Sequence, residues 1–111
     1  PVALPVKFPL LLAQGVEGIA VGLSTKIMPH NFRELCKASI DVLRGRDIQL
    51  FPDFPTGGLC DVTNYNGGLR GSKIRLRATI EKVDKTLLVI RDIPYGTTTT
   101  ALMESIVKAS E

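Results

Sequence analysis

Aromatic residues are scarce in this sequence, and tryptophan is absent altogether. Phe and Tyr make up 5% of the 111 residues, so a hydrophobic core has to be built from Leu, Ile and Val. No apolar run approaches the roughly 20 residues of a membrane-spanning helix, because Lys, Pro and Gly interrupt every candidate. With 44% hydrophobic and 23% charged residues, the chain is long enough for one globular domain without a membrane anchor.

Histidine and cysteine are too few for a zinc site. His30 is the only histidine, and Cys36 and Cys60 are far apart, whereas structural zinc needs about four ligands. The aspartates show no calcium-loop spacing. Because no secretion signal is present, we expect free thiols, a cytoplasmic location, and no metal or cofactor held by this chain.

The clearest predicted helix follows Asn31. Asn31 is a suitable N-cap, Glu34 stands three residues later as in a capping box, and Gly45 is typical of a helix C-terminus. One face carries apolar or small residues at helical spacing: Phe32, Leu35, Cys36, Ser39, Ile40 and Leu43. The opposite face carries charged residues, Arg33, Lys37, Asp41 and Arg44.

The second half of the chain shows strand patterns. Residues 73–80 alternate between basic or polar and apolar side chains, and residues 86–93 return as a more apolar strand after a turn at Asp84-Lys85. Together they predict an antiparallel hairpin. Shorter strands are expected at 48–51 and 59–62.

The two ends of the chain carry further signals. Leu10 to Ala13 is compatible with a buried strand or a helix end, and a last amphipathic helix is expected after the threonines at 97–100, with Leu102, Met103, Ile106 and Val107 inward. Because the sequence starts with Pro and this helix runs to the last residue, we expect an excised piece whose final helix, near 97–111, is truncated. Helices mixed with mainly antiparallel strands predict a single α+β domain over residues 1–111.

Three glycines, Gly15, Gly18 and Gly22, surround an apolar run centred on Ile19. Their spacing matches neither the dinucleotide fingerprint nor the phosphate loop. The next helix begins about nine residues after Gly22, so its N-terminus cannot meet a phosphate held there. Glycine lets the backbone approach another surface closely. Ile19 is therefore either a buried plug or an outward apolar wedge of the kind that unstacks base pairs, and the residue pattern leaves both open.

Cations gather on the predicted strand at 73–80. Lys73, Arg75 and Arg77 share one strand face, and Arg70 lies just before them. Such a face is either an ordinary solvated surface or a surface that tracks the phosphates of a nucleic acid. The net charge of +3 permits a nucleic-acid partner without requiring one.

A self-contained hydrolytic site would have to use the single histidine. His30 could act with the hydroxyl of Ser24 or Thr25, but no acid is placed to orient the base. We therefore expect His30 to serve local structure at the helix entrance.

Several motifs follow one another in a recognisable order: Leu4-Pro5-x-x-x-Pro9-x-Leu-Leu, Gly15-x-x-Gly18-Ile19-Ala20-Val21-Gly22, Thr25-x-Ile27-x-Pro29-His30-Asn31, Asp53-Phe54-Pro55-Thr56, Arg70-Gly71-x-Lys73-x-x-x-Arg77-Ala78 and Ile93-Pro94-Tyr95. Together they resemble the A subunit of the bacterial type IIA topoisomerases, DNA gyrase and topoisomerase IV. The resemblance covers essentially the whole chain, and its details are more similar to topoisomerase IV.

The resemblance implies a part of the DNA breakage-reunion core that lies largely in the tower domain. The family changes DNA topology by ATP-dependent breakage, passage and rejoining of double strands. By this resemblance, Ile19 matches the isoleucine that intercalates and bends the cut duplex. The cations that match surfaces along the bent DNA arms are Lys26, Arg70, Lys73, Arg75 and Arg77.

The catalytic machinery of that family is not in this chain. Its nucleophile is a tyrosine that follows an arginine upstream of the matched segment, and neither Tyr65 nor Tyr95 fits that pattern. The resemblance assigns Mg²⁺ and ATP to a partner B subunit, and a second A subunit completes a heterotetramer in contact with the nucleoid. We expect a DNA-bending piece that does not cleave DNA alone; the alternative is a stand-alone structural or interaction module with a solvated basic face.

Overall fold

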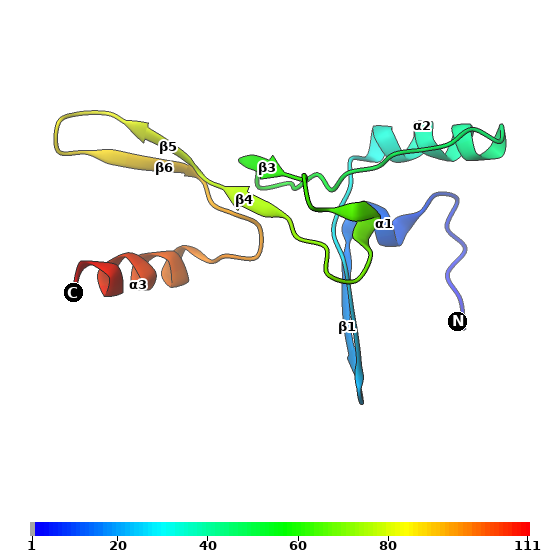
Figure 1. Ribbon diagram of the computed structural model, residues 1–111, viewed down its shortest axis with the longest axis horizontal. Coiled ribbons are helices and arrows are strands. Elements are labelled where there is room, and N and C mark those ends of the chain that lie inside the picture. Colours follow the sequence, from blue (N-terminus) through cyan, green and yellow to red (C-terminus); the bar gives the residue numbers. More distant parts are fainter. Residues whose placement is uncertain (1) are drawn as a thin grey trace. The chain divides into compact units, whose positions relative to one another are not determined.

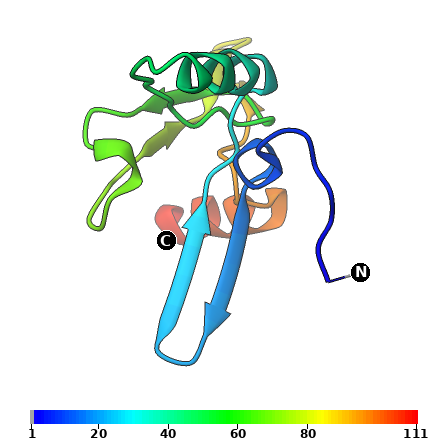
Figure 2. The same ribbon diagram turned by 90° about the vertical axis from the view of Figure 1, so that its right-hand side faces the viewer.

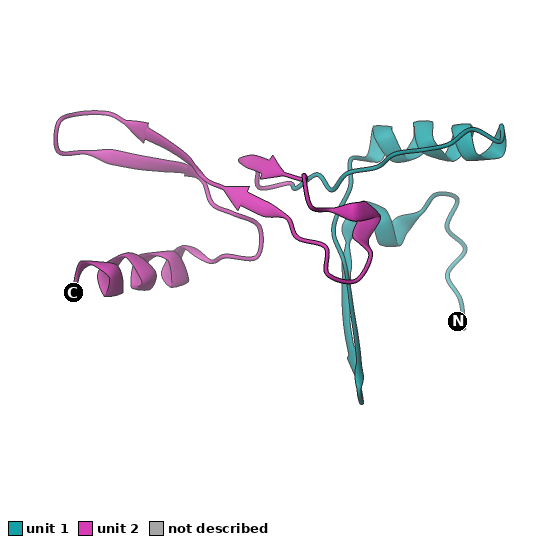
Figure 3. Cartoon of the chain, in the orientation of Figure 1, with its two compact units in different colours: residues 1–54 teal, residues 55–111 magenta. Residues whose placement is uncertain are grey.

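The computed structural model describes residues 2–111, and the chain divides into two compact units, residues 1–54 and residues 55–111 (Figure 3). Each unit combines helical structure with antiparallel strand pairs (Figure 1). The predicted α+β class is therefore confirmed. The single domain expected over residues 1–111 stays a prediction, because the structure does not determine how the two units are placed relative to each other.

Unit 1 is built around a two-stranded hairpin. After helix α1 (Leu10–Gln14), strands β1 (Val16–Ala20) and β2 (Leu23–Ile27) pair antiparallel through a two-residue loop. Figure 2 shows the hairpin extending away from α1, with its loop at the far end. Gly22 takes a φ of 75° at the second loop position, where a left-handed residue closes the turn. Leu10–Gln14 is therefore helical, and the glycine-spaced stretch is a hairpin.

Helix α2 (Phe32–Leu43) begins and ends at the predicted caps. The Asn31 side chain accepts two backbone N–H bonds from the first turn, at 3.0 and 3.3 Å. At the other end Gly45 has a φ of 72°, and the N–H of Arg46 donates to the carbonyl of Asp41 at 2.9 Å. This is the Schellman arrangement that satisfies the last carbonyls of a helix.

The core of unit 1 is small. Its buried residues are Pro29, His30, Leu35, Ala38, Pro52 and Phe54. On the apolar face predicted for α2, Leu35 is buried and Cys36 and Ser39 are half-buried, whereas Phe32, Ile40 and Leu43 are exposed. The pattern marks an apolar face, but within residues 2–54 no second layer covers all of it.

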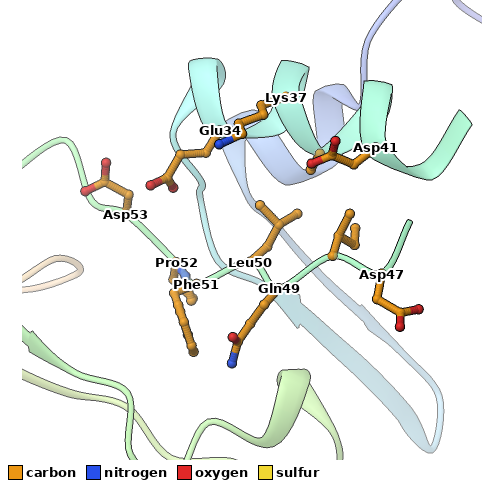
Figure 4. Close-up of a pocket in the computed structure, with 11 residues that line it drawn as sticks. Glu34, Lys37, Asp41, Asp47, Gln49, Leu50, Phe51, Pro52 and Asp53 are labelled. Atoms are coloured by element: carbon orange, nitrogen blue, oxygen red, sulfur yellow. The ribbon is translucent and has the colours of Figure 1, made fainter. Parts of the chain in front are cut away.

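The strand predicted at residues 48–51 is wrong. Residues 46–54 form no regular element, and the N–H of Asp53 donates to the carbonyl of Pro29 at 2.9 Å. This segment runs along α2 instead of along another strand, so most of its backbone lacks a ladder partner (Figure 4).

Unit 2 contains two separate strand pairs. Strand β3 (Leu59–Asp61) pairs with β4 (Arg75–Arg77), and β5 (Thr79–Lys82) pairs with β6 (Leu88–Asp92). The hairpin expected from the alternation is therefore confirmed, but the expected strand at 73–80 is divided. Its two parts have different partners, which local alternation cannot reveal.

The remaining elements of unit 2 are helical. A 3₁₀ turn, η1 (Asn66–Gly68), lies between β3 and β4, and helix α3 (Thr99–Ser110) begins where the Thr98 hydroxyl accepts the Ala101 N–H at 3.1 Å. Leu102 is half-buried, whereas the other three residues predicted to face inward, Met103, Ile106 and Val107, are exposed. None of the helices within residues 2–111 is long and apolar enough to cross a membrane.

The chain exposes much more surface than compact domains do. Its accessible surface is 9589 Å². Two separate compact domains of half this mass would together expose about 7,300 Å². Taken apart, the two units would expose at least 9589 Å², so the excess belongs to the units themselves, and it includes many of the large apolar side chains. Each unit thus presents apolar surface that a partner or further polypeptide can cover.

Candidate nucleic-acid interface

Ile19 lies near the tip of the β1–β2 hairpin, and 83% of its surface is exposed. It pairs with Ser24 across the hairpin, and Val21 in the loop is fully exposed. The interpretation of Ile19 as a buried plug therefore does not hold for this chain. The hairpin instead presents an apolar tip that protrudes from its unit (Figure 2).

The strand register places Lys26 on the same face of the hairpin as Ile19. The pairs Ile19–Ser24 and Glu17–Lys26 are two residues apart along the strands, so their side chains point to the same side. Lys26 is exposed and stands about 7 Å further from the tip at the usual rise per residue. An apolar side chain near the tip is thus followed by a cation closer to the hairpin root.

The root of the hairpin is tightly packed around Gly15. Gly15 has a φ of 72°, and a Cβ placed there would lie 2.8 Å from the Ile27 oxygen and 2.9 Å from the Pro29 nitrogen. His30 is 8% exposed, and its Nδ1 lies 2.8 Å from the Met28 carbonyl oxygen and 3.1 Å from that of Leu12. The residues before β1 and after β2 are therefore bound together where the hairpin leaves the unit.

The hydrogen bonds of His30 in the described structure go to the backbone. Carbonyl oxygens only accept, so Nδ1 carries a proton and donates it to the two carbonyls. Within residues 2–111 no hydrogen bond joins His30 to Ser24 or Thr25. The structure supports the local role expected for His30 at the entrance to α2.

In unit 2, the predicted alternation of exposed and covered side chains runs along residues 73–78. Lys73, Arg75 and Arg77 are exposed, while the intervening Ile74 and Leu76 are half-buried. Only Arg75 and Arg77 belong to β4, because Lys73 precedes it, and Arg70 is exposed in the turn before. In the described part of the chain, the ion pairs are Arg46–Asp41 and Arg91–Glu81, so none of these four cations is in one.

Asp61 is an acidic residue on β3, the strand that pairs with β4. It pairs with Arg75 in the β3–β4 register, and its Oδ1 accepts the Thr63 hydroxyl at 2.6 Å and the Thr63 N–H at 3.0 Å. These two hydrogen bonds lower the pKa of Asp61 below its usual value, and the charges of Arg75 and Arg77 lower it further. The carboxylate is thus held ionised beside the cations.

Replacing Thr63 with valine should raise the pKa of Asp61 toward its usual value, because the hydrogen bond that lowers this pKa most is lost. In the unaltered chain the lowered pKa stabilises the fold above the unfolded pKa near 3.8. That contribution disappears as the pH falls through the lowered folded pKa. Carboxyl NMR titration measures the shift, with Thr97→Val as a control that removes a hydroxyl elsewhere in unit 2. An unchanged Asp61 titration in Thr63→Val would contradict the assignment.

A groove of about 560 Å³ lies between α2 and residues 47–53 in unit 1 (Figure 4). Four carboxylates and one ammonium line it: Glu34, Asp41, Asp47, Asp53 and Lys37. Two of these carboxylates have partners, because Asp53 accepts a hydrogen bond from Asn31 at 3.2 Å and Asp41 pairs with Arg46 at 3.4 Å. The groove is not predicted by the sequence pattern, since nothing in residues 47–53 shows that they fold back along α2. Its charge is unfavourable for phosphate, so it is no part of a DNA surface.

The predicted site residues fall into two groups. Ile19 and Lys26 share the hairpin of unit 1, whereas Arg70, Lys73, Arg75 and Arg77 belong to unit 2. Among the residues that the structure describes, no group of three or more His, Cys, Asp or Glu side chains is arranged to hold a metal ion. Among the predicted site residues, the exposed apolar tip and one exposed cation therefore belong to unit 1, and the other four exposed cations belong to unit 2.

Comparison with known proteins gives a consistent result. The family model for the A subunit of DNA gyrase/topoisomerase IV matches residues 1–111. Similar proteins include the A subunits of DNA topoisomerase 4 from Borreliella burgdorferi (48% identity, 98% of this chain), of DNA gyrase from Lawsonia intracellularis (39%, 96%) and of DNA topoisomerase 4 from Rickettsia conorii (43%, 96%). The chain spans 17%, 15% and 16% of the length of these relatives, respectively. The chain belongs to the family of DNA gyrase and topoisomerase IV A subunits, which are the A subunits of type IIA topoisomerases.

Proposed function

We propose that this chain is a DNA-binding and DNA-bending part of a topoisomerase A subunit, in a tower-type region. Ile19 enters the stack of a duplex, and Lys26, Arg70, Lys73, Arg75 and Arg77 contact its phosphates. The observation that carries the proposal is the exposure of Ile19, 83%, near the tip of a protruding two-stranded hairpin. An exposed apolar side chain in that position is suited to enter an apolar site on a partner.

The free energies of unstacking and of apolar burial indicate that Ile19 and the cations contribute differently to DNA binding. Unstacking one base step costs a few kcal/mol. Burying one isoleucine side chain returns about 1.5–3 kcal/mol. The wedge therefore roughly offsets the distortion that it causes and adds little net affinity. Affinity has to come from phosphate contacts, so Ile19 determines bending and the cations determine binding strength.

The wider activity is proposed on the same basis. The relatives are named as A subunits of DNA topoisomerase 4 or DNA gyrase. We infer that this chain acts on double-stranded DNA in the cytoplasm, near the nucleoid, with a second A subunit, together with a B subunit. Mg²⁺ and ATP then act through the B subunit, while strand cleavage uses a tyrosine outside this chain. The chain alone is accordingly proposed to be inactive in cleavage.

Ile19→Ala is expected to reduce DNA bending far more than DNA binding. The substitution removes about three carbon groups from the wedge, which makes the bent state roughly 2 kcal/mol less favourable. The ratio of bent to straight duplex should fall about 30-fold at saturating protein. Energy transfer between dyes at the two duplex ends measures this ratio in the assembled enzyme.

Leu88→Ala is the matched control. Leu88 is also an exposed aliphatic residue, 65% accessible, but it lies on β6 in the other unit. It should leave the bend unchanged. If Ile19→Ala bends DNA as well as the unaltered enzyme does, Ile19 is not the wedge.

A further inference from the structure

His30 is a buried titratable side chain that the proposed DNA contact does not use. Its Nδ1–H is shared between the carbonyl oxygens of Met28, at 2.8 Å, and Leu12, at 3.1 Å. Leu12 belongs to α1, which precedes the hairpin, and Met28 directly follows β2. One side chain therefore ties together the two chain segments that enter and leave the hairpin.

The neighbouring residues extend this connection to α2. The Pro29 carbonyl accepts the Asp53 N–H at 2.9 Å, and Asn31 caps the first turn of α2. Gly15 lies so close to Ile27 and Pro29 that even a Cβ has no room. Residues 28–31 thus form a junction that bonds to several different parts of unit 1.

The hairpin itself depends on this junction. β1 is exposed along its whole length, and β2 is exposed except at Ile27. A two-stranded hairpin without a covering layer has little stability of its own. Its direction relative to α1 and α2 is therefore set at the root.

We propose that His30 is a positioning residue that fixes the direction of the β1–β2 hairpin and so allows Ile19 to hold a duplex bent. This inference rests on the proposed function. A bent duplex exerts a restoring force on the wedge, because smooth bending stores elastic energy. If the root yields, the hairpin follows the duplex and the bend relaxes. His30 opposes that motion by joining both sides of the root through one buried donor.

Two variants of similar polarity separate this role from simple burial. In His30→Asn the amide nitrogen lies near the position of Nδ1, whereas in His30→Gln it lies one carbon further, near that of Nε2. In the assembled enzyme, His30→Asn should bend DNA almost as the unaltered protein does. His30→Gln should lower the ratio of bent to straight duplex roughly tenfold, the usual effect of losing one buried hydrogen bond. Duplex affinity should change less than about threefold.

Hydrogen exchange provides the second measurement. In His30→Gln, the backbone amides of residues 11–15, 28, 30 and 31 should exchange faster, while the paired amides within residues 16–27 keep the same order of protection among themselves. Faster exchange throughout unit 1 in both variants would mean that His30 only stabilises the fold, which overturns the proposal. Equal bending by both variants, or lost bending with an unchanged root, would overturn it as well.

The Ile19→Ala variant shows whether a negative result concerns the positioning role of His30 or the proposed DNA-bending function itself. If Ile19→Ala loses bending and both His30 variants retain it, the positioning role fails and the proposed function stands. If Ile19→Ala also bends DNA normally, the proposed function itself fails, and the positioning role with it.

Discussion

Gly15→Ala should disrupt the root of the β1–β2 hairpin. Gly15 has φ 72° and ψ 158°, a region that is essentially restricted to glycine and costs other residues about 1–3 kcal/mol. The added Cβ would also lie 2.8 Å from the Ile27 oxygen and 2.9 Å from the Pro29 nitrogen. Both are backbone atoms, so the clash cannot be relieved by rotating a side chain. Together these effects should cost roughly 3 kcal/mol or more, a large share of the 5–15 kcal/mol that stabilises a typical domain.

Substitutions at two other glycines separate the cost of the left-handed backbone conformation from the cost of the steric clash. Gly45 has the same φ of 72°, but a methyl group added there would have no atom within 4 Å, so Gly45→Ala should cost only about 1 kcal/mol. Gly18 has no left-handed φ, and its nearest atom, Thr25 Cγ2, is at an ordinary 3.6 Å, so Gly18→Ala should be tolerated. Hydrogen exchange across residues 10–45 ranks the three variants. Equal losses for Gly15→Ala and Gly45→Ala would show that the root can relax.

Neutralising the basic face should weaken duplex binding about 100-fold at 0.15 M salt. Each neutralised phosphate contributes about 0.9 to the slope of log affinity against log salt. Replacing Lys73, Arg75 and Arg77 with glutamine should therefore make that slope less steep by up to about 2.7. The loss should be similar for all duplex sequences, because phosphate contacts carry no sequence information. Fluorescence anisotropy over a salt series, with the assembled enzyme, measures both quantities.

A second triple variant controls for net charge. Arg33, Lys37 and Arg44 are three cations on or next to α2 in unit 1. Their replacement by glutamine removes the same charge but should barely change affinity. If the basic-face variant also binds with nearly unchanged affinity, the alternative of a module with a solvated basic face is favoured. Equal large losses in both variants would show that only the total charge matters.

Features that depend on neighbouring residues in the chain are the ones that the sequence predicts best. The N-cap at Asn31, the terminal Gly45 and a helix start near the threonines at 97–100 follow from local chemistry, and the structure has each of them, the last with Thr98 as the cap. The β1–β2 hairpin is harder to predict because its loop is Val21-Gly22 and lacks the Asn-Gly or Asp-Gly pair that marks many two-residue turns. The glycine spacing distinguishes this stretch but does not predict its strand pairing.

Features that depend on distant partners are not predictable from local pattern. An apolar helix face shows which side can be buried, but Ile40 and Met103 remain exposed because no layer within the described residues covers them. The exposure of Ile19 has the same origin, since composition cannot show whether a surface covers it. The role proposed for Ile19 therefore combines its observed exposure with the family to which the chain belongs.

The chain changes strand partner at Ala78, because β4 pairs with β3 and β5 pairs with β6. This change limits how the length of residues 73–77 can vary. β4 is registered against β3 so that Arg75 lies opposite Asp61, and the Arg77 carbonyl lies against Gly58, where a Cβ would approach it to 2.7 Å. Inserting or deleting one residue in 73–77 would turn cations of this strand toward the covered side. The turn at residues 84–87 has no such restriction, because it only joins β5 to β6. Inherited length changes should therefore accumulate in that turn and be excluded from the basic strand.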